Sequence, residues 1–325
     1  MLQTESDIIG HLRAAFPQRD DIAPLGIGDD TARLAPGWDL VTMDTMTEGV
    51  HFERRYASYG DIAFRALSAN LSDIAAMGGE PGPFLISLAI PKPGFDEPAL
   101  QSLIRGFVDC LDAHQVKQCV PIGGDVVRSA GGFTLSITLL GHSPAPGPVL
   151  RTGAQAGDVI VVFRALGASA LGLELLQRGE QDRFPALARA HLRPLVDVQL
   201  GAAIGQASVV SSMLDLSDGL WTDLPRLLQG GIGARIDADC LPQHEDILEC
   251  AEYLGVSAIQ MALTGGEDFT LLATVPHAKL ETLRDLASLV GCKMTAIGEI
   301  VAESGVTFEH SGRPLQVDDS AFRHF

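Results

Sequence analysis

Positive charge is scarce in this sequence. Its 325 residues include 23 Lys and Arg against 41 Asp and Glu, which gives a formal net charge of −18. A chain this acidic is a poor partner for nucleic acid or for an anionic membrane, so the composition excludes both. A phosphorylated ligand remains compatible with the charge, because divalent cations can bring an anion to an acidic site.

The common nucleotide-binding and nucleophile motifs are also missing. No lysine follows a glycine, as a P-loop requires, and the lysines are Lys92, Lys117, Lys279 and Lys293. The sequence has no GxSxG elbow, no HRD-type catalytic loop and no histidine pair with the spacing of a zinc site. A nucleotide enzyme with this sequence would therefore hold phosphates through metal ions and glycine backbone amides.

Cysteines and long apolar runs are few. The 5 cysteines form no CxxC pair, and their odd number and wide scatter are typical of reduced thiols in a cytosolic protein. No apolar run approaches the length that spans a bilayer, and the first residues lack the pattern of a secretion signal. We therefore expect a cytoplasmic protein.

The length and the order of the predicted elements indicate two domains. A chain of 325 residues is long for a single core. Between residues 40 and 140, strands and helices alternate in a way that predicts an α+β domain, with helices on one face of a sheet. Prolines and glycines between 141 and 148 mark the boundary, so the expected domains are residues 1–147 and 148–325.

Residue periodicity locates the individual elements. It predicts helices at 4–16, 61–76, 97–113, 168–177, 194–207, 220–229, 245–254 and 278–290. It predicts strands at 40–46, 84–90, 133–140, 159–163, 234–237, 269–275 and 294–299. A further short strand is expected from Val120, running into a double-glycine turn that ends at Asp125.

The predicted helix at 61–76 carries two polar residues among small and apolar ones. Asn70 and Asp73 lie three positions apart and so share one face of the helix. An Asp packed against a core is costly unless it is paired or binds a metal ion. A solvated helix face explains the two residues equally well, so this helix alone does not identify a site.

Carboxylates recur in glycine- or serine-containing turns. These turns are Gly28-Asp29-Asp30, Gly124-Asp125, Ser217-Asp218-Gly219 and Gly265-Gly266-Glu267-Asp268, and Asp44, Asp73 and Asp215 extend the set. Converging carboxylates repel one another, and Mg²⁺ relieves this repulsion because it prefers hard oxygen ligands and retains substrate phosphates. The preference of Asp and Gly for turns explains any one of these segments, but their recurrence favours a metal-dependent phosphate site.

Basic residues are few near these turns, and one of them, Arg128, follows Gly124-Asp125. Arg151 precedes a glycine and has the forked guanidinium that clamps a polyphosphate, although an ordinary surface arginine fits the spacing equally well. His51 is the one histidine placed next to an acidic segment, at Thr47-Glu-Gly-Val-His-Phe52.

Together these segments resemble the thiamine-monophosphate kinase family. The matching segments occur in the family's order across essentially the whole chain: Gly26-Ile-Gly-Asp-Asp30, Asp44-Thr-Met-Thr-Glu-Gly-Val-His-Phe52, Asn70-Leu-Ser-Asp-Ile-Ala-Ala-Met-Gly78, Gly123-Gly-Asp125, Arg151-Thr-Gly-Ala, Leu214-Asp-Leu-Ser-Asp-Gly219 and Thr264-Gly-Gly-Glu-Asp268. The wider superfamily includes aminoimidazole ribonucleotide synthetase, selenophosphate synthetase and the hydrogenase maturation dehydratase.

The resemblance implies a fold, a reaction and a set of roles. The implied fold is an α+β N-terminal domain, whose sheet pairs across a homodimer, followed by an α/β C-terminal domain. The implied reaction is the ATP-dependent, direct in-line phosphorylation of thiamine monophosphate to thiamine diphosphate, assisted by several Mg²⁺ ions. The implied metal ligands are Asp30, Thr42, Asp44, Asp73, Asp125, Asp215 and Asp218. Of these, Asp30, Asp73, Asp125 and Asp218 are the expected catalytic residues. The implied ATP contacts are Gly124, Asp125, Arg151 and Ser217, and the implied acceptor contacts are His51, Glu267 and Phe322.

Two positions depart from the family pattern. Met43 stands where the family usually has Thr, which removes a side-chain ligand, and Ile104 stands where many members have an aromatic residue near the adenine. Two other interpretations compete with a thiamine-monophosphate kinase: a superfamily enzyme with a different acceptor, and a nucleotide-binding scaffold without activity. The nearly intact acidic set disfavours the scaffold, and the lack of any cysteine before Cys110 disfavours selenophosphate synthesis.

Overall fold

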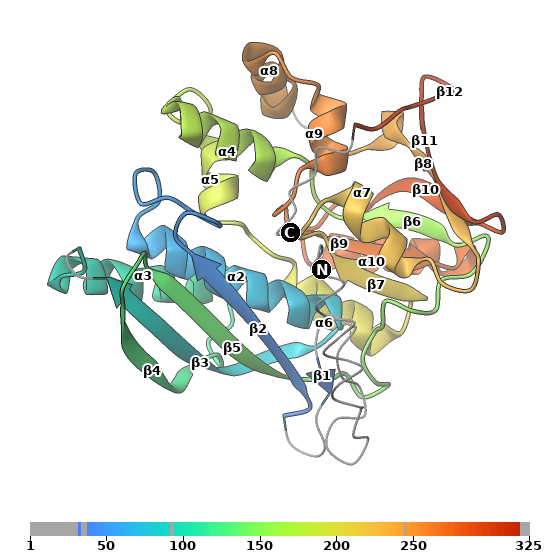
Figure 1. Cartoon of the computed structure of the whole chain (residues 1–325). Coiled ribbons are helices and arrows are strands. Elements are labelled where there is room, and N and C mark those ends of the chain that lie inside the picture. The colour runs from blue at the N-terminus through green and yellow to red at the C-terminus, as the bar shows by residue number, and fades with distance from the viewer. Residues whose placement is uncertain (1–31, 34–37, 92–93, 244, 319–325) are drawn as a thin grey trace, which may run out of the picture.

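The computed structural model describes residues 32–33, 38–91, 94–243 and 245–318. Over these ranges the chain forms a five-stranded and a seven-stranded sheet, each packed against helices (Figure 1). The predicted helix at 4–16, the turn with Asp30 and the tail with Phe322 lie outside the described residues. No helix in the described ranges is both long enough and apolar enough to cross a membrane.

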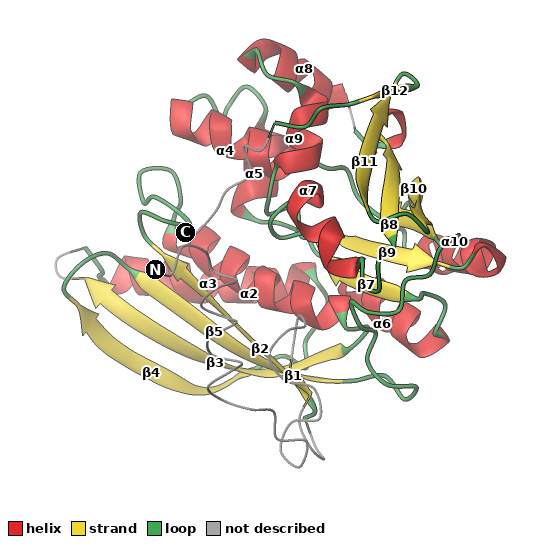
Figure 2. Ribbon diagram, turned by 45° about the vertical axis from the view of Figure 1, so that its right-hand side comes forward, coloured by secondary structure: helices red, strands yellow, loops and turns green. Residues whose placement is uncertain are grey.

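The first sheet has helices on one face. Its elements are β1 (Ala32–Arg33), β2 (Leu40–Thr47), α2 (Tyr59–Ala76), β3 (Glu80–Pro91), α3 (Glu97–Ala113), β4 (Pro121–Ser129) and β5 (Thr134–His142). The strand order is β1-β2-β5-β3-β4, with only β3 and β4 parallel. Along β5, Leu135 and Ile137 are buried while Ser136 is half-exposed, so the two faces differ in polarity. Helices α2 and α3 cover the apolar face (Figure 2).

Helix α2 is central to the molecule. It begins with a capping box: Ser58 Oγ accepts the Asp61 N–H, and the Asp61 carboxylate accepts the Ser58 N–H. The helix is buried along nearly its whole length, because the first sheet, α3 and the second domain all pack against it. It approaches α3 very closely, since a Cβ at Gly106 would lie 2.1 Å from the Gly60 carbonyl oxygen. Only glycine fits at this crossing.

The second sheet belongs to the C-terminal part of the chain. Its elements are β6 (Val159–Val162), α4 (Ala168–Arg178), α5 (Pro185–Leu192), α6 (Val198–Ala207), β7 (Ser212–Asp215), α7 (Leu220–Asp223), the 3₁₀ turn Leu224–Leu227, β8 (Gly233–Asp237), α8 (Glu245–Leu254), α9 (Ala258–Thr264), β9 (Leu271–Val275), α10 (Leu280–Leu289), β10 (Thr295–Val301), β11 (Gly305–His310) and β12 (Arg313–Pro314). The strand order is β12-β11-β8-β10-β6-β9-β7, and only β8 and β11 run parallel.

Both faces of the second sheet are covered along β6, β7 and β9, whose residues are almost all buried. Val161 packs in one apolar cluster with residues of α6 and α10, whereas its neighbours Ile160 and Val162 pack in another with residues of α7 and α9. Ala75 and Ala76, at the end of α2, belong to the Val161 cluster. Helix α2 therefore contributes to the cores of both domains and fixes them to each other.

Several predicted elements are corrected by the structure. Strand β4 continues through Gly123 and Gly124 to Ser129, where a turn was expected, because it pairs with β3 along this whole length. The helix expected at 194–207 begins at Val198. Proline at 225 converts the helix expected at 220–229 into one α-helical turn and a 3₁₀ turn. Helices α5 and α9 and strands β11 and β12 were missed, since each is too short for a clear periodicity.

The Gly106 contact yields a stability prediction. Gly106→Ala should gain up to about 1 kcal/mol of helix propensity, but the clash with the Gly60 carbonyl should cost about 1–3 kcal/mol and dominate. The matched control is Gly131→Ala, because a Cβ there meets no atom within 4 Å. Urea unfolding checks this, since Gly106→Ala should have a lower unfolding midpoint than Gly131→Ala. Equal midpoints would show that α2 and α3 can move apart at Gly106 without loss of stability.

Candidate functional site

Three predicted metal ligands converge where the two domains meet. Asp73 lies on α2, Asp44 on β2, and Asp215 ends β7. Thr42, also a predicted ligand, donates its hydroxyl to Asp73 Oδ2. The Asp44 and Asp73 carboxyl groups are close enough to shift each other's pKa, and Ser72 Oγ donates to Asp215 Oδ2 at 2.8 Å. The alternative of a solvated helix face at Asp73 is therefore wrong.

The charges of this carboxylate cluster, defined as Asp44, Asp73 and Asp215, are poorly compensated. Burial and the Asp215 carboxylate raise the pKa of Asp44 to about 6. Burial, Asp44 and Asp215 raise the pKa of Asp73 well above its usual value, and burial raises the pKa of Asp215. A raised pKa means that the carboxyl group holds its proton more tightly, so the cluster favours binding a proton or another cation.

The donor set suits Mg²⁺, which prefers carboxylate and hydroxyl oxygens. In the described ranges, however, no group of three or more His, Cys, Asp or Glu side chains is already gathered closely enough to hold an ion. The predicted ligand Asp30 lies outside those ranges. The cluster thus has oxygen ligands of the type that Mg²⁺ prefers, but these side chains would have to move closer together to coordinate an ion.

Asp218 lies beside the cluster but is paired with arginine. Arg226 forms an ion pair with Asp218 and a second one with the buried Asp223, whose Oδ1 lies 2.8 Å from Nη1. Burial raises the pKa of Asp223 to about 7, and the Asp223 carboxylate also accepts the Asp218 N–H at 2.9 Å. Neither Arg226 nor Asp223 was singled out from the sequence, because their connection to the Ser217-Asp218 turn depends on the α7 turn.

The predicted ATP contacts fall into two groups. Ser217 lies beside the carboxylate cluster, and its carbonyl accepts the Glu267 N–H at 2.7 Å. Arg151 is close enough to Asp215 to lower that carboxyl's pKa, against the larger effect of burial. Gly124 and Asp125 lie instead on the exposed strand β4.

Asp125 is separated from the carboxylate cluster within one copy of the chain. Across the sheet, Asp125 of β4 pairs with Ser87 of β3, which pairs with Ser136 of β5. Ser136 pairs in turn with Thr45 of β2, the neighbour of Asp44. Three strand spacings amount to about 14 Å. The structure therefore gathers Asp44, Asp73 and Asp215, with Asp218 beside them, but does not bring Asp125 to them.

The predicted acceptor contacts His51 and Glu267 are connected through a residue that sequence reasoning overlooked. Arg65 is 4% exposed, donates from Nη1 to the His51 carbonyl at 2.9 Å and forms an ion pair with Glu267. Burial would raise the pKa of Glu267, but the charge of Arg65 and its hydrogen bond to the carboxylate outweigh burial and lower the pKa. The one available signal was a lone arginine at the start of a helix of small residues.

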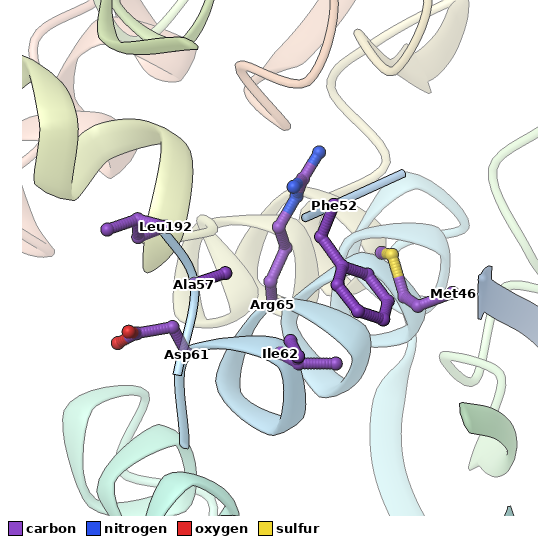
Figure 3. A pocket seen from close by; sticks show the side chains of 7 residues that line it. All are labelled: Met46, Phe52, Ala57, Asp61, Ile62, Arg65 and Leu192. Atoms are coloured by element: carbon purple, nitrogen blue, oxygen red, sulfur yellow. The ribbon is translucent and has the colours of Figure 1, made fainter. Parts of the chain in front are cut away.

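Helix α2 separates this acceptor end from the carboxylate cluster. Arg65 and Asp73 are eight residues apart, which places them about 80° apart around the helix and about 12 Å apart along its axis. Beside Arg65 is a pocket with apolar walls (Figure 3); its lining residues are Met46, Phe52, Ala57, Asp61, Ile62, Arg65 and Leu192. A charged, partly apolar end and a carboxylate end thus share one rigid helix.

The carboxylate repulsion yields a prediction about stability. With metal ions removed by a chelator, the free energy of unfolding of Asp73→Asn at pH 8 should exceed that of the wild type by roughly 1 kcal/mol, because the substitution removes one charge from the cluster. The gain should shrink toward pH 6, because protonation relieves the same repulsion in the wild type as the pH falls through the raised pKa values. Asp182→Asn, on an exposed turn, is the control. A pH-independent difference would show that the carboxylates do not repel.

Comparison with known proteins agrees with these features. The AIR synthase related protein N-terminal domain matches residues 28–143, and the corresponding C-terminal domain matches residues 155–311. Thiamine-monophosphate kinase of Salmonella typhimurium is 34% identical over 309 residues, covering 92% of this chain and 91% of that protein. The Escherichia coli K12 enzyme of the same name is 35% identical over 310 residues, covering 93% and 92%.

Solved structures show the same relationship. AaThiL complexed with AMPPCP and TMP has a TM-score of 0.83 at 30% identity, covering 99% of this chain and 97% of that chain. Thiamine-monophosphate kinase from Stenotrophomonas maltophilia K279a has a TM-score of 0.76 at 33% identity, covering 95% and 96%. The HypE–HypF complex, at 18% identity and a TM-score of 0.76, shares the fold alone. The chain belongs to the AIR synthase related family and, within it, to the thiamine-monophosphate kinases.

Proposed function

We propose that this chain transfers the γ-phosphoryl group of ATP directly to the phosphate of thiamine monophosphate, releasing ADP and thiamine diphosphate. The relatives named above support the reaction, since one of them is complexed with the ATP analogue AMPPCP and with TMP. The observation that carries the proposal to this chain is α2, which has the carboxylate cluster at one end and the Arg65–Glu267 pair at the other.

The proposed transfer needs little proton chemistry. The bond between the γ-phosphorus and the bridging oxygen of ADP breaks, and a bond forms to an oxygen of the acceptor phosphate. That oxygen is already anionic near neutral pH, so no strong general base is required. Positioning the two anions in line is then the main task of the protein.

The carboxylates provide the means to bring these anions together. Asp30, Thr42, Asp44, Asp73, Asp125, Asp215 and Asp218 would hold Mg²⁺ ions. Bound Mg²⁺ supplies charge neutralisation between the nucleotide phosphates and the acceptor phosphate. Gly124, Arg151 and Ser217 would contact ATP, while His51, Glu267 and Phe322 would contact the acceptor. At the acceptor end, the Glu267 carboxylate is suited to accept hydrogen bonds from an aminopyrimidine.

A homodimer is part of the proposal. Met43 on β2 and Leu85 on β3 both pair with Thr138 of β5, so they share the face of the first sheet away from α2 and α3. They are 60% and 39% exposed, which is unusual for apolar residues in mid-sheet. The separation of Asp125 from Asp44 favours a site to which the second copy contributes Asp125. We also propose a cytoplasmic location, in keeping with the five free cysteines.

The central test is ADP release. With ATP, Mg²⁺ and thiamine monophosphate, the wild type should turn over, EDTA should abolish the activity, and Mg²⁺ in excess should restore it. Thiamine and other phosphorylated acceptors should give no more than background. Asp73→Asn should lose most of kcat while remaining folded, and Asp182→Asn should retain it. Turnover undiminished by chelation, or a better acceptor in the panel, would contradict the proposal.

The dimer can be tested by complementation. Light scattering should give twice the chain mass of 34.4 kDa. Asp44→Asn and Asp125→Asn should each be inactive, but each mixed dimer should contain one intact site. Random mixing should therefore restore about a quarter of wild-type activity, by subunit statistics. A single-chain mass, or no restoration after confirmed subunit exchange, would argue against a shared site.

A further inference from the structure

Arg65 holds two segments of the acceptor end at once. Its Nη1 donates to the His51 carbonyl at 2.9 Å, and its Nη2 pairs with Glu267 Oε1. These partners come from different domains, so a single guanidinium fixes their separation. With the side chain 4% exposed, this arrangement is shielded from competing water.

His191 holds Arg65 in turn. Arg65 Nη1 lies 3.1 Å from His191 Nε2, and because an arginine can only donate, Nε2 must be the acceptor. The imidazole proton is therefore on Nδ1, which lies 3.0 Å from Ser169 Oγ and 3.6 Å from Glu267 Oε2. Burial and the Arg65 charge lower the pKa of His191 to about 3, so the ring is neutral under ordinary conditions.

The loop that carries Glu267 is fixed from its other side. Glu267 has a left-handed φ of 65°, which is uncommon for a residue with a side chain. Next to it, the Asp268 carboxylate accepts the Gly167 N–H at 2.6 Å and the Ser169 N–H at 3.0 Å. The contacts thus form a closed circuit from Glu267 through Arg65, His191 and Ser169 to Asp268 and back to Glu267.

We propose that Arg65 and His191 are positioning residues for the acceptor, which keep the Glu267 carboxylate charged and correctly oriented to bind the amino group of the acceptor's heterocycle. This inference rests on the proposed function. Neither residue needs to touch the reacting phosphates, since the acceptor end lies about 12 Å along α2 from Asp73.

The charges around Glu267 make this role measurable. The groups that face its carboxylate are Arg65 from α2, His191 from α5, His51 and Tyr56 from the segment before α2, and the neighbouring Asp268. Among these named groups, only Arg65 carries a permanent positive charge. In Arg65→Gln the half-buried Glu267 would become easier to protonate, and its ability to accept hydrogen bonds would be lost as the pH falls.

The experiment compares Arg65→Gln, Arg65→Lys and a matched control. Arg65→Gln should raise KM for thiamine monophosphate by roughly tenfold at pH 8, with a larger rise at pH 6, while KM for ATP barely changes. Arg65→Lys should recover part of the loss and most of the pH independence. The control is Arg164→Gln, which breaks the pair between Arg164 Nε and the buried Asp197 at 2.7 Å. It should lower thermal stability without changing either KM.

The second variant pair concerns His191. His191→Leu should raise KM for the acceptor several-fold, whereas His191→Gln, whose amide oxygen can still accept from Arg65, should lie closer to wild type. Calorimetric binding of thiamine monophosphate to protein saturated with Mg²⁺ and AMPPCP gives a readout independent of turnover. If wild-type protein released no ADP with thiamine monophosphate, the proposed function would fail. The inference would be overturned if Arg65→Gln bound the acceptor as tightly as the wild type. It would also be overturned if the KM values for the acceptor and for ATP rose in parallel, or if the variant lost stability without any change in KM.

Discussion

Repulsion among closely placed carboxylates, of which Asp215 is buried and Asp44 and Asp73 are half-buried, is the constraint on which the rest of this structure depends. Asp44, Asp73 and Asp215 come from a strand of one domain, the central helix and a strand of the other domain. Folding brings them together; burial and repulsion by neighbouring carboxylates raise the pKa of Asp44 and Asp73, and burial raises the pKa of Asp215. A protein retains such an arrangement at a cost in stability, which a bound cation can offset. This physical argument supports our proposal that the cluster binds a cation and the phosphates that accompany it.

Helix α2 sets the distance between the two ends of this site. Glycine contacts let it pack tightly against α3, and its last turn belongs to the core of the second domain. The two proposed functions, charge neutralisation near Asp73 and acceptor recognition near Arg65, would then lie at a fixed separation on one rigid element. An enzyme that joins two anions benefits from this rigidity, since small displacements of either reactant reduce the rate strongly.

The acidic turns and most of the helices and strands could be predicted from the sequence, each from a different kind of signal. Acidic turns are visible because Gly beside Asp is a local pattern, and long amphipathic helices such as 97–113 are visible from their period. The link from Arg65 to His191 was invisible, since the residues are 126 positions apart and neither has a motif. Likewise, the separation of Asp125 from Asp44 depends on strand order, and the ion pair of Asp218 with Arg226 depends on a local turn.

The most direct test of this account is the number of protons released when Mg²⁺ binds. Isothermal titration of the metal-free protein at pH 7 in buffers of different ionisation enthalpy measures that number. Because the raised pKa values of Asp44 and Asp73 leave the metal-free cluster partly protonated, Mg²⁺ binding should release a substantial fraction of a proton per protein chain, and Asp73→Asn should abolish most of the release. Binding of Mg²⁺ without proton release in the wild type would show that the ion is held elsewhere, and would contradict the role assigned to these carboxylates.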